Sequence, residues 1–206
     1  MRFHRVIHGI FQILEEDYGL LEAKMIAGKA QGRYLGLCRE NKDDSKQKRA
    51  HTFSRIYPCI AMYQTLRAHG LNPEQAQYYI HEYFQRFSMK LVPLMQWSAS
   101  LPHVAENLPS LFMKISKMAF PPEAGFSYEF PEHKENQIRF NITRCPYMDA
   151  CMKYQCPEIC RAFCDSDDTA YGNLHPSLHW KRTQTIGRGA EYCDFMIEYE
   201  KETNAS

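Results

Sequence analysis

The sequence predicts an α+β protein, in which an N-terminal helical layer packs on a C-terminal ββααββ unit with a four-stranded antiparallel sheet. Three observations lead to this prediction. Apolar residues recur at helical spacing through the first half, they alternate from Phe126 onward, and six of the eight cysteines lie at or after Cys145. We therefore expect a helical scaffold region (residues 1–122), an α+β region that carries the site (residues 123–200) and a flexible tail (residues 201–206).

Composition and charge limit which classes of function are possible for this sequence. The 206 residues are 44% apolar, which is enough to bury a core without disulfides. A net charge of +1 provides no basic stripe for nucleic acid. No segment approaches the roughly 20 apolar residues that span a bilayer. The N-terminal apolar stretch is broken by His8 and Gln12 and lacks a cleavage site, so it predicts an amphipathic helix and a cytoplasmic protein with reduced thiols.

Helices should fill the scaffold region. After the first helix we expect others over residues 20–37 and 51–69, and Pro58 either kinks the latter or marks its start. The charge-rich run between them, residues 39–49, mixes both signs and predicts a solvated loop.

The next helix has a clear start signal. Asn72 can cap it, Pro73 takes the first position and Gln75 completes a capping box, which predicts a helix from 73 to about 91. Asn107 and Pro109 open the last helix of this region.

The α+β region begins with a predicted hairpin. Its first strand alternates from Phe126 to Phe130, residues 132–137 turn the chain, and the second strand alternates from Ile138 to Ile142. Two helices that begin at prolines follow, over residues 146–153 and 157 to about 170. Two further strands are then expected on either side of a Gly187-Arg188-Gly189 turn, with inward faces formed by Leu178, Trp180, Arg182 and Gln184 and by Cys193, Phe195, Ile197 and Tyr199.

The cysteines differ in their predicted surroundings. Cys145 and Cys156 each precede a proline at a helix start, where free N–H groups and the helix dipole favour a thiolate. Cys160 and Cys164 lie one turn apart on the following helix and share a face with Cys156, where simple packing is the alternative. Cys193 shares its strand face with apolar residues, so burial is expected for it.

A metal centre receives little support from the spacing. The cysteines contain no C-x-x-C pair, which structural zinc and iron–sulfur sites usually show. His175 and His179 with Cys164 and Asp167 form a weak zinc pattern, so we predict neither metal nor cofactor.

Arg182 is the most informative polar residue. An arginine aimed at a core needs a carboxylate partner. That partner is either a protein acid among Asp165, Asp167 and Asp168 or the acid group of a ligand, and the residues alone leave both open.

Five C-terminal motifs together resemble the L-2-amino-thiazoline-4-carboxylic acid hydrolase family. They are Arg144-Cys145-Pro146-Tyr147, Cys156-Pro157-Glu158-Ile159-Cys160, Phe163-Cys164-Asp165-Ser166-Asp167, Lys181-Arg182-Thr183-Gln184-Thr185 and Cys193-Asp194-Phe195. The resemblance extends over residues 52–199, and His175 and His179 stand where the family tends to have asparagine and lysine. The family pattern centres on Cys145, Cys164, Asp167, Arg182, Thr185, Cys193 and Asp194.

The resemblance implies hydrolysis of a carboxylated cyclic amidine, with ring opening to a carbamoyl-cysteine. It implies Cys145 as nucleophile and Asp167 with Asp194 as amidinium partners and proton carriers. Cys164 and Cys193 complete the catalytic set, and the substrate-binding residues are Arg182, which holds the carboxylate, and Thr185. Direct attack by water activated by Asp167, with Cys145 structural, remains an alternative. The implied partner is a small molecule with a carboxylate, and oligomer formation stays open.

Two other classes of function use the same residues. A sensor would hold a carboxylated or thiol ligand in the cysteine-rich pocket and show saturable binding without turnover. A metal-binding redox module would carry stoichiometric zinc or iron. The hydrolase is our prediction from the sequence because the family resemblance favours it.

Overall fold

In the computed structural model, which describes residues 2–131, 134 and 136–201, the chain begins with the long helix α1 (Arg5–Glu40). His4 caps this helix by accepting a hydrogen bond from the Val6 amide. Helical geometry breaks at Gly19, whose φ of 73° is a conformation that favours glycine. The predicted first helix and the predicted helix over 20–37 are therefore confirmed as the two halves of α1.

The charge-rich run is helical at both ends, so the predicted loop is confined to residues 41–45. Its first residues close α1, and Lys46–His51 form α2. The Ser45 side chain caps α2 by accepting from the Lys48 amide, and the Asp44 carboxylate pairs with the Lys48 ammonium at 2.9 Å. The mixed charges thus supply a cap and a stabilising pair one turn apart, which favour a helix.

A wide helical turn precedes Pro58. α2 runs through a π-helical segment, η1 (Thr52–Ile56), directly into α3 (Tyr57–Ala68). Proline lacks an N–H and its ring crowds the carbonyl four residues earlier, so an α-helical register cannot pass through it undisturbed. The π turn absorbs this disturbance, which confirms the helix over 51–69 and puts the start of its α-helical part at Tyr57.

Both halves of the predicted capping box form at the start of α4 (Pro73–Ala99). The Asn72 side chain accepts from the Gln75 amide at 2.8 Å, and the Gln75 side chain accepts from the Asn72 amide at 2.9 Å. The predicted end of this helix and the predicted start of α5 (Val104–Ala119) are wrong, because α4 continues past Pro93 and α5 begins before Pro109. Tertiary contacts hold the last turns of α4, where the Gln96 side chain donates to the Asn173 carbonyl at 2.8 Å.

The sheet has the predicted four antiparallel strands, in the order β1-β2-β4-β3. Its strands are β1 (Ser127–Glu129), β2 (Gln137–Arg144), β3 (Leu178–Lys181) and β4 (Cys193–Tyr199). Phe140 of β2 is opposite Phe195 of β4, and their rings stack 4.9 Å apart. β3 ends before Arg182, so Arg182 and Gln184 lie just beyond the strand that was predicted to contain them.

Helices separate the two hairpins, as predicted for the ββααββ unit. The second predicted helix is divided into a short turn and an α-helix, so there are three helical elements. They are α6 (Pro146–Lys153), the 3-10 turn η3 (Pro157–Ile159) and α7 (Cys160–Tyr171). Two more 3-10 turns, η2 (Pro122–Ala124) and η4 (Ile186–Arg188), lie before β1 and before β4. The predicted turn at 132–137 and the predicted tail lie largely outside the described residues.

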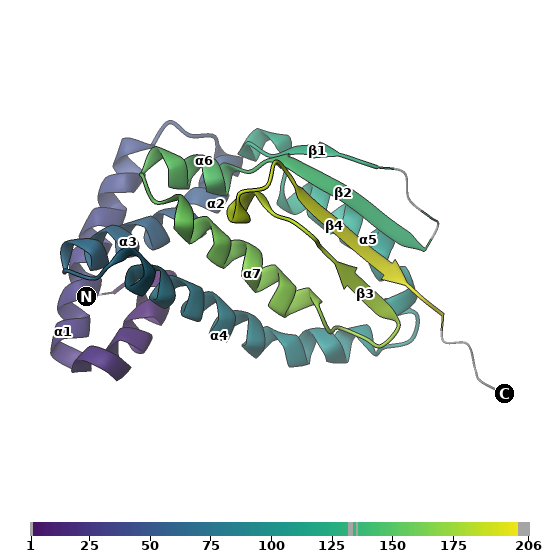
Figure 1. The fold of residues 1–206 in the computed structure, drawn as a ribbon, viewed down its shortest axis with the longest axis horizontal. Coiled ribbons are helices and arrows are strands. Elements are labelled where there is room, and N and C mark those ends of the chain that lie inside the picture. The colour runs from purple at the N-terminus through teal and green to yellow at the C-terminus, as the bar shows by residue number, and fades with distance from the viewer. Residues whose placement is uncertain (1, 132–133, 135, 202–206) are drawn as a thin grey trace.

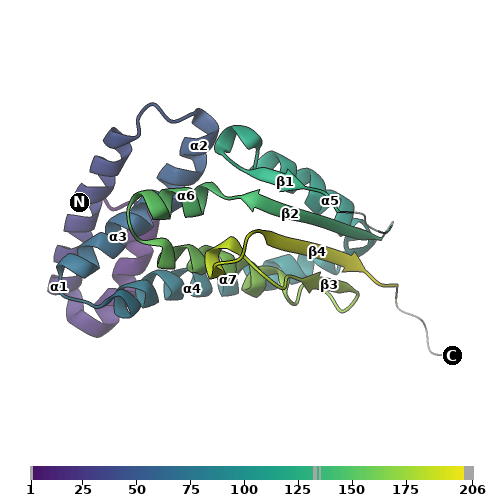
Figure 2. The same cartoon turned by 45° about the horizontal axis from the view of Figure 1, so that its top comes forward.

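The elements form a helical end and a sheet end (Figure 1). α1 and α3 lie at one end, the strands lie at the other, and α4 and α7 run side by side between them. Figure 2 shows α5 alongside the strands, and it packs on β2 and β4. One apolar core extends from α1 to β4. Among the residues described, no helix is long and apolar enough to cross a membrane.

Candidate functional site

A cavity of about 260 Å³ lies where the helical end meets the sheet. The starts of α1 and α6, the η1 turn, α4, α5, α7 and the inward face of the sheet all contribute to its lining. Many of the lining side chains are aromatic. Five of the seven residues predicted from the sequence line this cavity, namely Cys145, Cys164, Asp167, Arg182 and Cys193.

The thiols reach the cavity from three elements. Cys160 and Cys164 occupy successive turns of α7, Cys145 caps α6, and Cys193 begins β4. Cys145 is at the predicted cap position, although its side chain makes no cap hydrogen bond. The Ile186 amide donates to the Cys193 sulfur at 3.2 Å.

Gly187 permits the close approach of η4 to α7. A Cβ atom at this position would lie 2.7 Å from the Cys164 sulfur and 3.3 Å from the Arg161 backbone. The glycine in the predicted turn is therefore required by packing against the thiol, in addition to any need of the turn itself.

The surroundings of Cys164 favour its thiolate. Hydrogen bonds with the thiols of Cys160 and Cys193 lower the pKa of Cys164, and they outweigh burial, which raises it. The Thr185 hydroxyl and the charge of Arg182 lower it further. The pKa of Cys193 is raised mainly by its hydrogen bond with Cys164, and hydrogen bonds with neighbouring thiols raise that of Cys160. Among the thiols that line the cavity, these shifts favour Cys164 as the thiolate; the pKa of Cys151, which lies outside the lining, is lowered to about 5 by its hydrogen bonds with Cys156 and Cys160.

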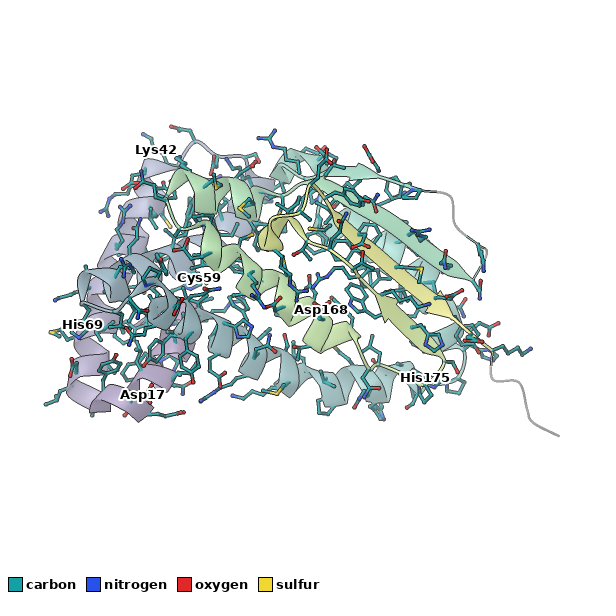
Figure 3. The ribbon with its side chains drawn as sticks, viewed as in Figure 1. Asp17, Lys42, Cys59, His69, Asp168 and His175 are labelled. Atoms are coloured by element: carbon teal, nitrogen blue, oxygen red, sulfur yellow. The ribbon has the colours of Figure 1, made fainter. Side chains whose placement is uncertain are left out.

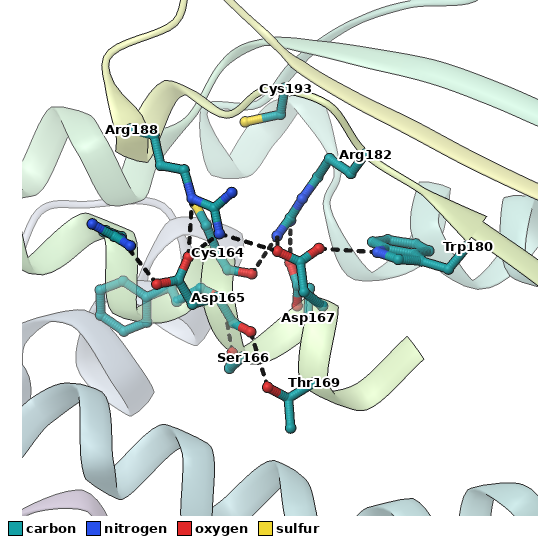
Figure 4. Close-up of polar contacts among 12 residues, drawn as sticks. Cys164, Asp165, Ser166, Asp167, Thr169, Trp180, Arg182, Arg188 and Cys193 are labelled. Atoms are coloured by element: carbon teal, nitrogen blue, oxygen red, sulfur yellow. Dashed lines mark hydrogen bonds and ion pairs between the residues drawn. The ribbon is translucent and has the colours of Figure 1, made fainter. Parts of the chain in front are cut away.

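Asp165 is occupied by structural ion pairs. Its carboxylate contacts Arg188 at 2.6 Å (Figure 4), Arg161 at 3.0 Å and His81 at 3.3 Å. These partners join α7 to η4 and to α4, so this acid fixes the position of the helix.

Asp168 and Asp167 have different surroundings, although both contact Arg182. The Asp168 carboxylate accepts from the Arg182 guanidinium at 2.6 Å and from the Trp180 indole at 3.0 Å. Asp167 contacts Arg182 at 3.3 Å and lines the cavity. Asp167 is therefore the member of this acidic run that a ligand can reach.

The Asp167 carboxyl titrates near neutrality. Burial raises its pKa to about 7, and the negative charges of Cys164 and Asp168 add to this effect, whereas Arg182 and Arg55 oppose it. The side chain is 41% accessible, and Asp167 lines the cavity. A carboxyl with this pKa can donate or accept a proton at physiological pH.

Arg182 is almost completely covered. Only 1% of its side chain is exposed, and its guanidinium lies near the faces of Trp180 and Phe195. Its terminal nitrogens bond Asp167, Asp168 and the Cys164 carbonyl, the last at 2.5 Å. Its Nε has no acceptor among the residues that the structure describes. Both terminal nitrogens are thus already engaged by acceptors of the protein itself.

Asp194 and Thr185 lie outside the cavity lining. Burial raises the pKa of Asp194, but hydrogen bonds with Thr183 and Gln184 outweigh it, so the pKa is lowered. The carboxylate accepts from the Thr183 amide at 2.9 Å, the Thr183 hydroxyl at 2.6 Å and the Gln184 amide at 2.8 Å. Thr185 is buried, and its hydroxyl faces Cys164 without a hydrogen bond of ordinary geometry. Both residues shape the segment between Arg182 and η4.

Cys156 does not behave as the sequence predicted. It precedes only the short turn η3, and it is outside α7, so it does not share a helix face with Cys160. Its hydrogen bond with Cys151 and its burial raise its pKa. The expected lowering is therefore wrong, because the turn is too short to supply a helix dipole.

The two histidines of the weak zinc pattern lie apart from the cavity. Figure 3 shows His175 at the end of the molecule, far from Asp168. The His175 Nδ1 atom accepts from the Ser177 amide at 3.1 Å, and the His179 Nε2 atom contacts Glu200 at 3.2 Å. Within the described ranges, no three His, Cys, Asp or Glu side chains are placed to hold a metal ion.

Two arginines in the cavity lining were missed by the sequence reasoning. Arg5 comes from the first turn of α1 and Arg55 from η1. The disturbance expected at Pro58 was a signal for an unusual turn around Arg55, whereas nothing in the sequence indicated that Arg5 reaches the same cavity.

Comparison with known proteins gives a family and distant structural similarities. No curated protein matches the sequence. An unliganded Fe(II) H-NOX protein from K. algicida covers all of both chains at 9% identity and a TM-score of 0.41. An H-NOX domain from Shewanella oneidensis covers 94% of this chain and 98% of its own at 11% identity and a TM-score of 0.31.

The family comparison covers most of the α+β region and part of the scaffold. The sequence model for L-2-amino-thiazoline-4-carboxylic acid hydrolase matches residues 49–197. These residues include η1, α3, α4, α5, α6, α7 and the complete set of cavity thiols. The resemblance inferred from the C-terminal motifs is confirmed, and the chain belongs to the L-2-amino-thiazoline-4-carboxylic acid hydrolase family.

Proposed function

We propose that this protein is a hydrolase that opens a small carboxylated cyclic amidine, such as L-2-amino-thiazoline-4-carboxylate, to a carbamoyl-cysteine. The main support is the pair formed by Cys164 and Asp167, which lie three residues apart on α7 and line one cavity. One favours a thiolate and the other holds a proton near neutral pH. Covalent attack on an amidine carbon uses both groups, the thiolate as nucleophile and the acid as proton donor to the leaving group.

The first step is attack of the Cys164 thiolate on the ring carbon that bears two nitrogens and a sulfur. The new C–S bond forms as the C–S bond of the ring breaks. The sulfur that leaves takes the proton of Asp167, so the substrate becomes a thiol joined through nitrogen to an amidine carbon on Cys164. Asp167 is then a carboxylate.

The second step is attack of water on that carbon. The Asp167 carboxylate takes a proton from the water, the carbon–Cys164 bond breaks and the thiolate is regenerated. One water is added overall, the product is a carbamoyl-cysteine, and no oxidant or reductant is consumed.

The remaining predicted residues support these two. Arg182 holds Asp167 and Asp168 in place, and Cys193 donates to the Cys164 thiolate. Cys145 contributes to the same cavity and remains the alternative nucleophile. Asp194 and Thr185 position the chain that lies against Cys164.

Intact-protein and small-molecule mass spectrometry tests this proposal. The protein is incubated with L-2-amino-thiazoline-4-carboxylate, and the mixture is followed for a product that has gained one water and for an adduct on a cysteine. We expect turnover and an adduct on Cys164 that is absent from Cys164→Ser. Saturable binding without turnover would contradict the hydrolase and support the sensor.

A further inference from the structure

The cavity carries more positive than negative charge. Its charged lining consists of Arg5, Arg55, Arg182 and a single acid, Asp167. Arg182 is already paired with Asp168 at 2.6 Å and contacts Asp167 at 3.3 Å. Neither Arg5 nor Arg55 forms an ion pair with an acid in the described part of the chain. The cavity therefore has two arginines that an anionic ligand can neutralise.

Arg55 is directed into the cavity. Burial raises the pKa of Asp167 and of Tyr171, both on α7, and the charge of Arg55 opposes this rise in each. Its guanidinium also interacts with the Tyr147 hydroxyl, which in turn contacts the His51 Nδ1 atom at 3.1 Å. These contacts orient the side chain before a ligand binds, which reduces the entropy lost on binding.

The local backbone explains this direction. Arg55 lies in the π-helical turn η1, just before Pro58 of α3. A π turn has one more residue per hydrogen-bonded ring than an α turn, so it rotates the side chains that follow, and such turns recur at functional sites.

We propose that Arg55 holds the carboxylate of the substrate and that Arg5 adds to the attraction. The identity of that substrate rests on the proposed function, whereas the preference for a carboxylate rests on the cavity itself. A guanidinium matches a carboxylate through two parallel hydrogen bonds. Arg55 has this fork free of acids, whereas the fork of Arg182 is occupied and covered.

The first experiment compares two substrates on three proteins. L-2-Amino-thiazoline-4-carboxylate and 2-aminothiazoline, which lacks the carboxylate, are assayed with wild type, Arg55→Gln and Arg49→Gln. Arg49 is a matched control because it is exposed and, among the residues described, its side chain donates only to the Lys42 carbonyl. For the acid, we expect Arg55→Gln to lower kcat/KM about 10- to 100-fold, mainly through KM, as expected for a lost hydrogen bond to a charged group.

For 2-aminothiazoline, we expect a change of less than about twofold, and Arg49→Gln should leave both substrates unaffected. Equal losses of kcat/KM for the acid and for 2-aminothiazoline in Arg55→Gln would overturn the carboxylate assignment. Arg55→Lys should recover part of the acid rate, because it restores the charge without the fork.

The second experiment does not require turnover. Cavity thiols are alkylated with iodoacetate, which carries a carboxylate, and with neutral iodoacetamide, and the modified cysteine is identified by peptide mapping. We expect the iodoacetate-to-iodoacetamide rate ratio to fall about tenfold in Arg55→Gln and to be unchanged in Arg49→Gln. An unchanged ratio in Arg55→Gln overturns the inference.

The two experiments separate the two proposals. Absence of turnover by wild type with an Arg55-dependent alkylation ratio would sink the hydrolase and keep the carboxylate site. Turnover with an Arg55-independent ratio would do the reverse. If Arg55→Gln has a lower melting temperature than wild type, Arg55→Lys takes its place in the alkylation assay, where a ratio equal to that of wild type counts against the fork.

Discussion

The arginines at the two sides of the cavity differ in how they are neutralised. Arg182 contacts two carboxylates and a carbonyl and is almost completely covered. Arg55 lines the same cavity and forms no ion pair with an acid within the described part of the chain. A covered, paired arginine orients its partners, and an open, unpaired one attracts a ligand. The same side chain thus supports two different tasks, and burial with pairing, rather than residue type, decides between them.

The first prediction tests whether Cys164 of α7, and not Cys145 at the start of α6, is the nucleophile. Replacing Cys164 by serine should lower kcat by about 10³-fold or more, because a serine hydroxyl is not ionised in these surroundings. Cys145→Ser is the matched control in the same cavity and should retain activity within about tenfold. The reverse order of effects would make Cys145 the nucleophile, and melting temperatures of both variants verify folding.

The second prediction concerns Asp167, where we expect Asp167→Asn to lower kcat/KM by about 10²-fold, typical for loss of a proton donor. The wild-type kcat/KM should fall as pH rises through about 7, because the protonated acid acts in the first step. This limb should be missing from Asp167→Asn. A pH–rate profile with the same falling limb in both proteins would exclude Asp167 as its origin.

The raised pKa of Asp167 also leads us to expect that the free energy of unfolding changes with pH. Its folded pKa of about 7 is above the ordinary value of 3.8, so the folded state binds more protons between these pH values. Stability from this group is therefore lost as pH rises through that window. Urea unfolding at several pH values should show a smaller loss in Asp167→Asn than in wild type, and equal slopes would contradict the raised pKa.

The third prediction sharpens the assignment of Arg182. A lysine cannot contact Asp167, Asp168 and the Cys164 carbonyl together, so Arg182→Lys should lower the free energy of unfolding by about 3 kcal/mol. Arg188→Lys, at a more exposed pair, should cost about 1 kcal/mol or less. The rate ratio between the acid and 2-aminothiazoline should be unchanged in Arg182→Lys. If the rate with the acid alone fell in Arg182→Lys, Arg182 would be the residue that binds the substrate carboxylate.

The smallest effect is expected from glycine substitutions. Gly187→Ala would push a methyl group against the Cys164 sulfur, and we expect a cost of about 1 to 3 kcal/mol in unfolding free energy. Gly28→Ala in α1 has no neighbour within 4 Å and should instead gain about 0.5 to 1 kcal/mol. Chemical denaturation checks both, and equal effects would show that the contact with Cys164 is unimportant.

Local sequence signals predicted the parts of the fold that depend on neighbouring residues. The capping box at Asn72 and the proline after Cys145 set helix starts through hydrogen bonds within a few residues, and both starts are correct. The end of α4 was wrong because contacts with distant segments carry the helix past Pro93. Tertiary packing supplies that information, and no local pattern contains it.

The candidate site was predictable only in part for the same reason. The motifs around Cys164 and Arg182 identified residues that do meet in one cavity. Asp165, Asp167 and Asp168 differ in their contacts because different elements pack against each of them. Arg55 of η1 lines the cavity for the same reason, since η1 packs beside it in the fold. Residue spacing could not separate an acid that fixes a helix from one that faces a ligand.

Peptide-mapped alkylation as a function of pH tests the central claim, that the thiolate of this site resides on Cys164. The eight thiols are labelled briefly with iodoacetamide between pH 5 and pH 9, and each is quantified by mass spectrometry. The account predicts that Cys164 is labelled first and still reacts below pH 7, where an ordinary thiol with a pKa of about 8.5 is almost silent. Labelling of Cys164 that rises only near pH 8.5, or that follows another cavity thiol at every pH, would contradict it.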